Sequence, residues 1–199
     1  MKLGILGATF DPVHKAHIQM AKYALDYCEY VLLTPCTKPP HKDNDNITED
    51  SARYSMLCLA LDGYERLIAS DIELKRETTT YTIDTLRQMK NEYSVFDGIV
   101  YVIGADTLFQ LTTWKEYEEV FKLCTFLVFE RKGFSRQQIH ERMDMLKKNY
   151  NADIIFDTRS VSEISSSVIR KAIVEGDDSI EWMLDKKVYR YIKEYGIYK

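Results

Sequence analysis

Short apolar runs alternate with longer amphipathic segments along almost the whole of this 199-residue chain. Runs rich in β-branched residues are typical of strands, and the segments between them have the periodicity of helices. A strand, a helix and a second strand in succession form a βαβ unit, whose strands lie parallel in one sheet. The pattern therefore predicts an α/β fold, a Rossmann-like, doubly wound parallel sheet of five or six strands with C-terminal helices.

The order of the predicted elements can be followed from end to end. The predicted strands are Lys2–Gly7, Tyr30–Pro35, Arg66–Ala69, Gly98–Ile103, Thr125–Glu130 and Asp153–Phe156, with Ile72–Leu74 as a further candidate. The predicted helices are Lys15–Tyr27, Glu49–Leu61 behind a Thr48 cap, Thr82–Glu92, Trp114–Phe121, Arg136–Asn149, Ser165–Val174 and Lys186–Glu194. Gly176 and Gly196 follow the last two helices, where glycine commonly ends a helix. We expect a single domain over 1–199, with 160–199 as a small C-terminal helical part, because no repeat or linker divides the chain.

Charge and composition exclude several classes of protein. A formal net charge of −4 argues against broad affinity for nucleic acid or acidic membranes, which requires a basic face. No window approaches about 18 uninterrupted apolar residues, so no membrane span is expected. The four cysteines have no zinc-type spacing, and no signal peptide precedes the first strand, so we expect a cytoplasmic protein with reduced thiols. The oligomeric state is left open, a homo-oligomer included.

The segment between the first predicted strand and helix carries the strongest functional signal: Gly7-Ala8-Thr9-Phe10-Asp11-Pro12-Val13-His14-Lys15-Ala16-His17. In such sheets, ligands bind beyond the carboxyl ends of the strands. Gly7 and Ala8 have little or no side chain, so a phosphate can approach the backbone N–H groups at the positive end of the helix. His14 and His17 are three residues apart and face the same side of the first helical turn.

This histidine pair is open to more than one interpretation. The two rings can donate hydrogen bonds to the α-phosphate and the bridging oxygen of ATP, where charge grows as pyrophosphate leaves. An isolated pair is equally compatible with one histidine that caps the helix and one that packs. Zinc is disfavoured, because two histidines make an incomplete site and neither HExxH nor a third ligand is near.

The same segment resembles the GxFxPxHxxH signature of the nucleotidyltransferase superfamily, and within it the chain is similar to the bacterial nicotinate-nucleotide adenylyltransferases. Ala8 and Ala16 stand where that family usually has glycine, a difference of one methyl group each. The resemblance implies that Gly7, Ala8, Thr9, Phe10 and His17 bind ATP, and that Ala8 and Thr9 also contact a pyridine mononucleotide.

Two later segments resemble the family's mononucleotide site. Pro39-Pro40-His41-Lys42 is similar to the PPHK loop, which implies that His41 and Lys42 meet the mononucleotide phosphate; a solvated basic turn is the alternative. Tyr81-Thr82-Ile83-Asp84-Thr85-Leu86 is similar to the YTxDTL segment, which places Tyr81 and Thr82 beside the pyridine ring and its carboxylate. Thr82 is also a good helix cap, whose neighbouring N–H groups suit an anionic carboxylate.

Three further matches complete the resemblance. Gly104-Ala105-Asp106 is similar to the family's GxD turn, which implies that Asp106 accepts hydrogen bonds from the ATP ribose, although Asp106 as a helix cap is the alternative. Trp114-Lys115 is similar to the family's WK position, which implies that Trp114 encloses the pyridine ring. A tryptophan that packs in the core is the alternative. Ile164-Ser165-Ser166-Ser167-Val168-Ile169-Arg170 is similar to ISSTxIR, a serine-capped helix on which Ser166 and Arg170 share one face and reach the β- and γ-phosphates.

Together these segments imply transfer of the adenylyl group of ATP to nicotinate mononucleotide by direct in-line displacement. His14, His17, Ser166 and Arg170 are the expected catalytic residues, acting by positioning and charge stabilisation. Mg²⁺ is expected to accompany ATP, held by phosphates and water and by no ligand from the protein. Whether Arg131 or Lys132 contacts the nucleotide is left open.

Three other functions are the alternatives to this one. A phosphopantetheine adenylyltransferase or a cytidylyltransferase shares the opening segment but lacks the PPHK, YTxDTL and WK set. A dehydrogenase is disfavoured because the first turn does not extend to GxGxxG. A catalytically silent nucleotide-binding protein with the same fold is the rival from another class, since fold alone does not establish activity.

Overall fold

The computed structural model describes residues 1–37, 47–76 and 79–198. Its centre is a six-stranded parallel sheet with the order β3-β2-β1-β4-β5-β6. The strands are β1 (Lys2–Ala8), β2 (Tyr30–Pro35), β3 (Leu67–Ala69), β4 (Gly98–Gly104), β5 (Thr125–Phe129) and β6 (Asp153–Asp157). The predicted α/β class and parallel sheet are confirmed.

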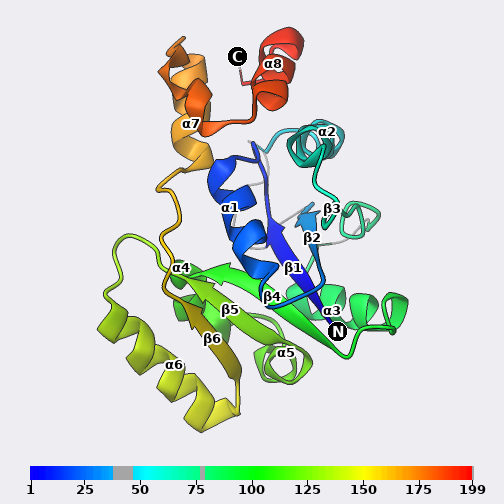
Figure 1. Cartoon of the computed structure of the whole chain (residues 1–199), viewed down its shortest axis with the longest axis vertical. Helices are drawn as coiled ribbons and strands as arrows, with labels where there is room; N and C mark the ends of the chain where they lie inside the picture. Colours follow the sequence, from blue (N-terminus) through cyan, green and yellow to red (C-terminus); the bar gives the residue numbers. More distant parts are fainter. Residues whose placement is uncertain (38–46, 77–78, 199) are drawn as a thin grey trace.

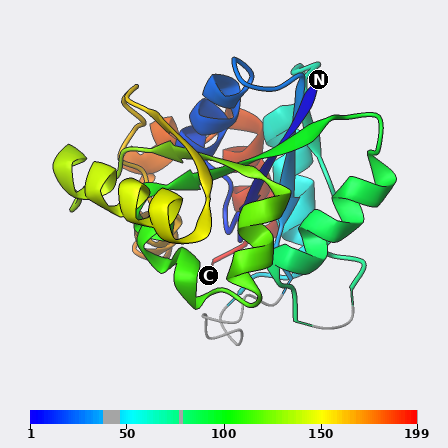
Figure 2. The ribbon, with the colours of Figure 1, turned by 90° about the horizontal axis from the view of Figure 1, so that it is seen from below.

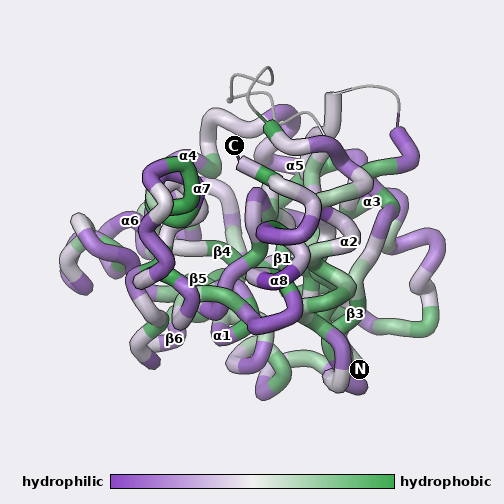
Figure 3. The backbone as a smooth tube through the Cα atoms, turned by 90° about the horizontal axis from the view of Figure 1, so that it is seen from above, coloured by the Kyte–Doolittle hydropathy of each residue, from purple (hydrophilic) through white to green (hydrophobic). Residues whose placement is uncertain are grey.

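The central strands are apolar along their whole length because both faces of the sheet are covered. Every residue of β5 is buried, as is every residue of β4 after Gly98. Continuous apolar runs of this kind distinguish such strands from half-exposed ones, in which polar residues alternate with apolar ones. Figure 3 shows the hydrophobic stretches gathered along the strands and the hydrophilic ones toward the periphery.

Helices cover the two faces in separate sets. They are α1 (Lys15–Ala24), α2 (Asp50–Leu61), α3 (Thr82–Glu92), α4 (Ala105–Gln110), α5 (Tyr117–Leu123), α6 (Arg136–Tyr150), α7 (Ser166–Val174) and α8 (Lys186–Tyr195), with the 3-10 turns η2 (Leu111–Thr113) and η3 (Asp178–Met183). One buried cluster packs α1, α2, α7 and α8 against the sheet. A second cluster packs α3, α4, α5 and α6 against it. Figure 2 shows the strands between α1 on one side and α3 and α5 on the other. No helix of the described residues is long and apolar enough to cross a membrane.

The strand order places a crevice at the carboxyl ends of β1 and β4. β1 pairs with β2 on one side and with β4 on the other, so the chain winds outward in opposite directions from this point. Loops that follow the two strands diverge here, and ligands of doubly wound folds bind in the resulting gap. Figure 1 shows α7 and α8 at the end of the molecule opposite the N-terminus, beyond the carboxyl end of β1.

Several predicted boundaries were wrong. No strand forms at Ile72–Leu74, which is a turn, and the first helix ends at Ala24 instead of Tyr27. The predicted helix at Trp114–Phe121 begins only at Tyr117, because Trp114 is extended and Glu116 adopts a left-handed conformation (φ 51°). The short helix α4 directly after β4 was missed. Gly196 does end α8 in the left-handed conformation (φ 61°), and Gly176 (φ 73°) follows α7, as expected.

Two of the three predicted helix caps were displaced by one residue. Thr48 and Thr82 were expected to cap α2 and α3, but the N-cap residues are Glu49 and Tyr81, and neither cap makes a side-chain bond. The N-cap residue of α7 is Ser165, within the predicted serine run, but its hydroxyl makes no cap bond and pairs with that of Ser167 at 2.7 Å. The N-termini of these three helices therefore have no side-chain cap bond.

Candidate active site

A cavity of about 1080 Å³ opens at the crevice between β1 and β4. Every predicted site residue among the described residues lines it: Gly7, Ala8, Thr9, Phe10, His14, His17, Tyr81, Thr82, Gly104, Asp106, Trp114, Ser166 and Arg170. These residues come from five separate stretches of the sequence, which the fold brings to one place. His41 and Lys42 lie outside the described residues.

The two histidines at the start of α1 stack on each other. His14 is the N-cap residue and His17 lies in the first turn; their ring centroids are 3.6 Å apart, with planes inclined by 17°. The His14 backbone N–H donates to Nδ1 of His17 at 3.3 Å. Because Nδ1 of His17 is an acceptor, the neutral ring carries its proton on Nε2 and can donate from that atom.

His14 is kept neutral by its surroundings. The residue is 3% exposed, and its Nδ1 atom has no hydrogen-bond partner among the described residues. Burial, and secondarily the positive charge of Arg131, lower the pKa of His14 from 6.5 to about 3. An uncharged imidazole with an unsatisfied buried nitrogen is suited to meet a polar group of a ligand, since such atoms rarely stay unpaired.

This pKa shift predicts a pH dependence of folding. Above pH 6.5 His14 is neutral in the folded and unfolded chain, whereas below it only the unfolded chain gains a proton, until the folded pKa of about 3 is reached. The free energy of unfolding therefore falls by about 1.4 kcal/mol per pH unit over this window. Between pH 7 and pH 5, we expect the wild type to lose about 2 kcal/mol more than His14→Gln in urea unfolding. His140→Gln, at an exposed histidine of α6, controls for loss of an imidazole. Equal losses for His14→Gln and wild type would contradict this assignment.

Ser166 and Arg170 of α7 both contact the loop after β1. The Ser166 hydroxyl donates to the Pro12 carbonyl at 3.0 Å, and Nη1 of Arg170 donates to the Asp11 carbonyl at 2.7 Å. Both side chains line the cavity. The predicted second anion site therefore lies directly against the first.

A carboxylate that follows β4 and an arginine that follows β5 lie together at the cavity. Arg131 lies 3.6 Å from Asp106, with both side chains partly exposed. Gly104 makes this approach possible, since a Cβ atom there would collide with Asp106 and would lie 3.0 Å from Cγ of Arg131. The cap expected as the alternative role of Asp106 is provided by Gly104, the N-cap of α4. Of the two undecided residues, Arg131 lines the cavity, whereas Lys132 pairs with Glu163 at 3.3 Å.

An aromatic corner forms the other end of the cavity. Tyr101 contacts Trp114 edge to face at 6.0 Å between centroids, and the Lys115 ammonium lies 4.5 Å from the centre of the Tyr81 ring. The Tyr101 hydroxyl lies beneath Gly7, where a Cβ atom would be only 2.7 Å from it. α3 begins here at Thr82, so its unpaired N–H groups face the same corner.

A group of buried polar residues behind the first loop was not predicted from the sequence. Arg53 is fully buried, and its guanidinium donates to the carbonyls of Thr9 at 2.5 Å and Thr48 at 2.9 Å. Asp11 is 3% exposed, and Glu73, with its pKa raised to about 7 mainly by burial, lines the cavity beside Tyr101. An arginine inside the apolar Asp50–Leu61 helix was the available signal, since arginine is rarely fully buried without partners.

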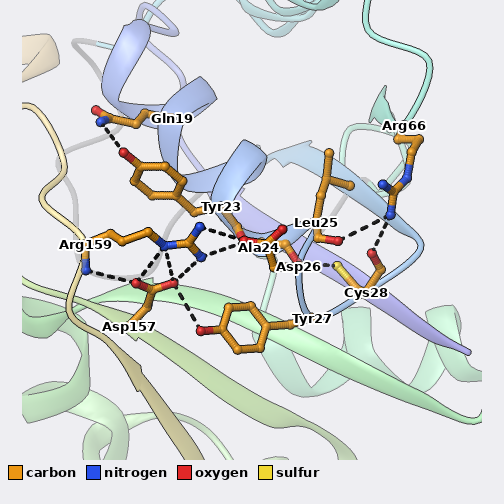
Figure 4. A network of polar contacts seen from close by, with 10 residues as sticks. All are labelled: Gln19, Tyr23, Ala24, Leu25, Asp26, Tyr27, Cys28, Arg66, Asp157 and Arg159. Carbon is orange, nitrogen blue, oxygen red and sulfur yellow. Dashed lines mark hydrogen bonds and ion pairs between the residues drawn. The ribbon is translucent and has the colours of Figure 1, made fainter.

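A second polar network holds α1 against the segment that leads to α7 (Figure 4). Arg159 donates to Asp157, Asp26 and the Tyr23 carbonyl, and its guanidinium lies 4.3 Å from the centre of the Tyr23 ring. Gln19 of α1 donates to the Ser160 carbonyl at 3.1 Å and accepts from the Ser162 N–H at 2.9 Å. The helix that carries the histidines is thereby fixed relative to the segment that carries Ser166 and Arg170.

The cavity is electrostatically suited to a polyanion. The helices α1, α3 and α7 all begin at its wall, and each N-terminus carries a partial positive charge. Arg131, Arg170 and Lys115 add full charges. Among residues 1–37, 47–76 and 79–198, no group of three or more His, Cys, Asp or Glu side chains could hold a metal ion.

Comparison with known proteins agrees with this geometry. The model of the cytidylyltransferase-like family matches residues 5–172. A protein of Clostridium botulinum (strain Okra / Type B1) named "Probable nicotinate-nucleotide adenylyltransferase" is 37% identical over 198 residues, which cover 98% of each chain. A protein of the same name from Thermoanaerobacter sp. (strain X514) is 35% identical over 204 residues, covering 100% of this chain and 95% of its own.

The fold is also found among solved structures. The nicotinic acid mononucleotide adenylyltransferase of Plasmodium falciparum complexed with NaAD superposes with a TM-score of 0.80 at 21% identity, over 99% of this chain and 97% of that one. This likeness concerns the arrangement of strands and helices.

Proposed function

The chain belongs to the cytidylyltransferase-like family, and we propose that its cavity joins ATP to nicotinate mononucleotide at the crevice between β1 and β4. The chain transfers the adenylyl group of ATP to nicotinate mononucleotide, giving nicotinate adenine dinucleotide and pyrophosphate, a reaction of NAD biosynthesis. The observation that carries the site assignment is the convergence of five sequence segments on one cavity whose walls include three helix N-termini.

The proposed reaction is a direct displacement at phosphorus. A phosphate oxygen of the mononucleotide attacks the α-phosphorus of ATP, the new P–O bond forms, and the bond from the α-phosphorus to the bridging oxygen of pyrophosphate breaks. Both leaving electrons go to the bridging oxygen. The protein contributes orientation and stabilisation of this charge, and no protein nucleophile is needed.

Each end of the cavity has a distinct proposed task. His17 donates from Nε2 to the reacting phosphate while the neutral ring of His14 holds it by stacking, and Ser166 and Arg170 bind the departing β- and γ-phosphates. Asp106 accepts from the ATP ribose. Gly7, Ala8, Thr9 and Phe10 form the floor between the two substrates. Mg²⁺ enters as the counterion of the ATP phosphates, as part of the substrate.

The aromatic corner is the proposed pyridine site. Tyr81 and Trp114 supply apolar surface for a flat ring, and the start of α3 at Thr82 presents N–H donors to the carboxylate. The mononucleotide phosphate then lies toward the loop after β1. This places the attacking oxygen near the histidines. The proposed contacts from His41 and Lys42 concern residues outside those that the structure describes.

Product identity tests the proposal. The protein is incubated with ATP and Mg²⁺ in three separate reactions, which contain nicotinate mononucleotide, nicotinamide mononucleotide or phosphopantetheine. The products are identified by mass spectrometry. We expect nicotinate adenine dinucleotide in the first reaction and no dephospho-coenzyme A in the third. A protein that binds ATP but yields no dinucleotide would be a silent nucleotide-binding member of the fold.

Arg170→Ala is expected to weaken the triphosphate end of the site. Losing a charge-assisted contact to phosphate costs about 1.5 to 3 kcal/mol, which corresponds to at least about tenfold weaker ATP binding. AMP, which lacks the β- and γ-phosphates, should bind nearly as well as before. Calorimetry with both nucleotides measures the difference, and Lys171→Ala, at an exposed neighbour on α7, is the matched control. Equal weakening of ATP and AMP would contradict the assignment.

A further inference from the structure

The chain that follows α8 reaches back to the loop after β1. Gly196 ends α8 in the left-handed conformation (φ 61°), and the Ile197 N–H donates to the Ile192 carbonyl at 3.1 Å. Tyr198 then turns inward, and its hydroxyl donates to Oδ1 of Asp11 at 2.6 Å. Two residues 187 positions apart in the sequence thus meet at the wall of the cavity.

Asp11 connects this contact to the triphosphate end of the site. Its carbonyl accepts from Nη1 of Arg170 at 2.7 Å, while Oδ2 accepts from the Thr48 N–H at 3.3 Å. The carboxylate is buried, and its donors among the described residues are two uncharged groups, the Tyr198 hydroxyl and the Thr48 amide. Arg170 is therefore free to direct its charge at a ligand as long as these donors satisfy Asp11.

We infer that Tyr198 is a positioning residue for ATP: its hydroxyl holds the Asp11 carboxylate away from Arg170, so that the guanidinium stays available to the β- and γ-phosphates. This inference rests on the proposed role of Arg170. A buried carboxylate that loses a donor must find another, because an unsatisfied buried charge is costly. Arg170 already donates to the backbone carbonyl of Asp11 and can supply the missing positive partner.

The position of Tyr198 is itself well supported. Val188 and Ile192 bury one face of α8 in the core cluster that includes α1 and α2. Lys187 of α8 also forms an ion pair with Asp62, directly after α2. Burial and the neighbouring Asp11 carboxylate raise the pKa of Tyr198, so the hydroxyl keeps its proton and acts as a donor at neutral pH.

Tyr198→Phe tests the inference because it removes only the hydroxyl. We expect KM for ATP to rise about tenfold, the effect of losing one hydrogen bond to a charged group, with KM for nicotinate mononucleotide changed less than about twofold. Tyr189→Phe is the matched control, since it removes a tyrosine–carboxylate bond of similar length (2.7 Å, to Asp178) from α8, the helix that precedes Tyr198, at a residue that does not line the cavity. Its KM values should equal those of the wild type.

A double-mutant cycle separates positioning from a purely structural role. In an Asp11→Asn background the competing charge is gone, so the added Tyr198→Phe substitution should no longer raise KM for ATP. A Tyr198→Phe protein with a lowered melting temperature but wild-type KM for ATP would overturn the inference, and so would an equal rise in both backgrounds. Failure of the Arg170 assignment would appear separately, as equal ATP and AMP losses in Arg170→Ala.

Discussion

His17→Ala is expected to lower kcat by about 10² to 10³ while ATP binding changes little. The loss of one preorganised donor to the charge that develops in a transition state commonly has this size. His17 is the member of the pair whose Nδ1 accepts from the His14 N–H, which leaves the proton of the neutral ring on Nε2, and the residue lines the cavity. Steady-state kinetics give kcat, and calorimetry with ATP gives the affinity.

The control for this variant is His140→Ala, which removes an exposed imidazole from α6, a helix outside the cavity. Its kcat should match that of the wild type. If His17→Ala retained a wild-type kcat, His17 would have no role in the transition state. A loss confined to ATP affinity would instead assign it to ground-state binding.

The second large effect concerns the choice of acceptor: nicotinate mononucleotide should be preferred over the nicotinamide form by about 10- to 100-fold in kcat/KM. The start of α3 presents backbone donors next to Tyr81, and the Lys115 ammonium lies over that ring. A carboxylate gains a charge-assisted hydrogen bond from such donors, whereas a carboxamide gains a weaker one. The preference therefore follows from the charge of the acceptor.

Measuring kcat/KM for both acceptors at the same ATP and Mg²⁺ concentrations decides the point. Trp114→Phe helps to separate recognition of the ring from recognition of the carboxylate, because a smaller aromatic wall should weaken both acceptors alike and leave their ratio unchanged. Equal values for the two acceptors in the wild type would disprove the pyridine site and leave the adenylyl transfer itself intact.

Sequence was most informative where an apolar run or a small-residue turn had one structural solution. The run Gly98–Ile103 is apolar throughout because β4 is buried on both faces, and it could be placed to within one residue. The segment Gly7 to His17 was assigned to a phosphate site because it joins a strand to a helix. The structure brings this segment together with Ser166 and Arg170, as the two predicted anion sites require.

Features that depend on tertiary contacts could not be predicted. Thr82 and Thr48 are good capping residues by type, yet the backbone turns into each helix one residue away from the predicted cap. Asp11 belongs to the recognised segment, but its importance arises from Tyr198 and Thr48, which no local pattern connects to it. Arg53 is similar, because its partners lie in the loop after β1 and before α2.

The most direct measurement follows the phosphorus atoms of ATP. The protein is given nicotinate mononucleotide, Mg²⁺ and ATP that carries a radioactive label either at the α-phosphate or at the γ-phosphate, and the products are separated by chromatography. Attack at the α-phosphorus predicts that the α label appears in the dinucleotide and the γ label in pyrophosphate, with equal amounts of the two products. Transfer of the γ label to the mononucleotide, or release of the α label as AMP without dinucleotide, would contradict adenylyl transfer at this site.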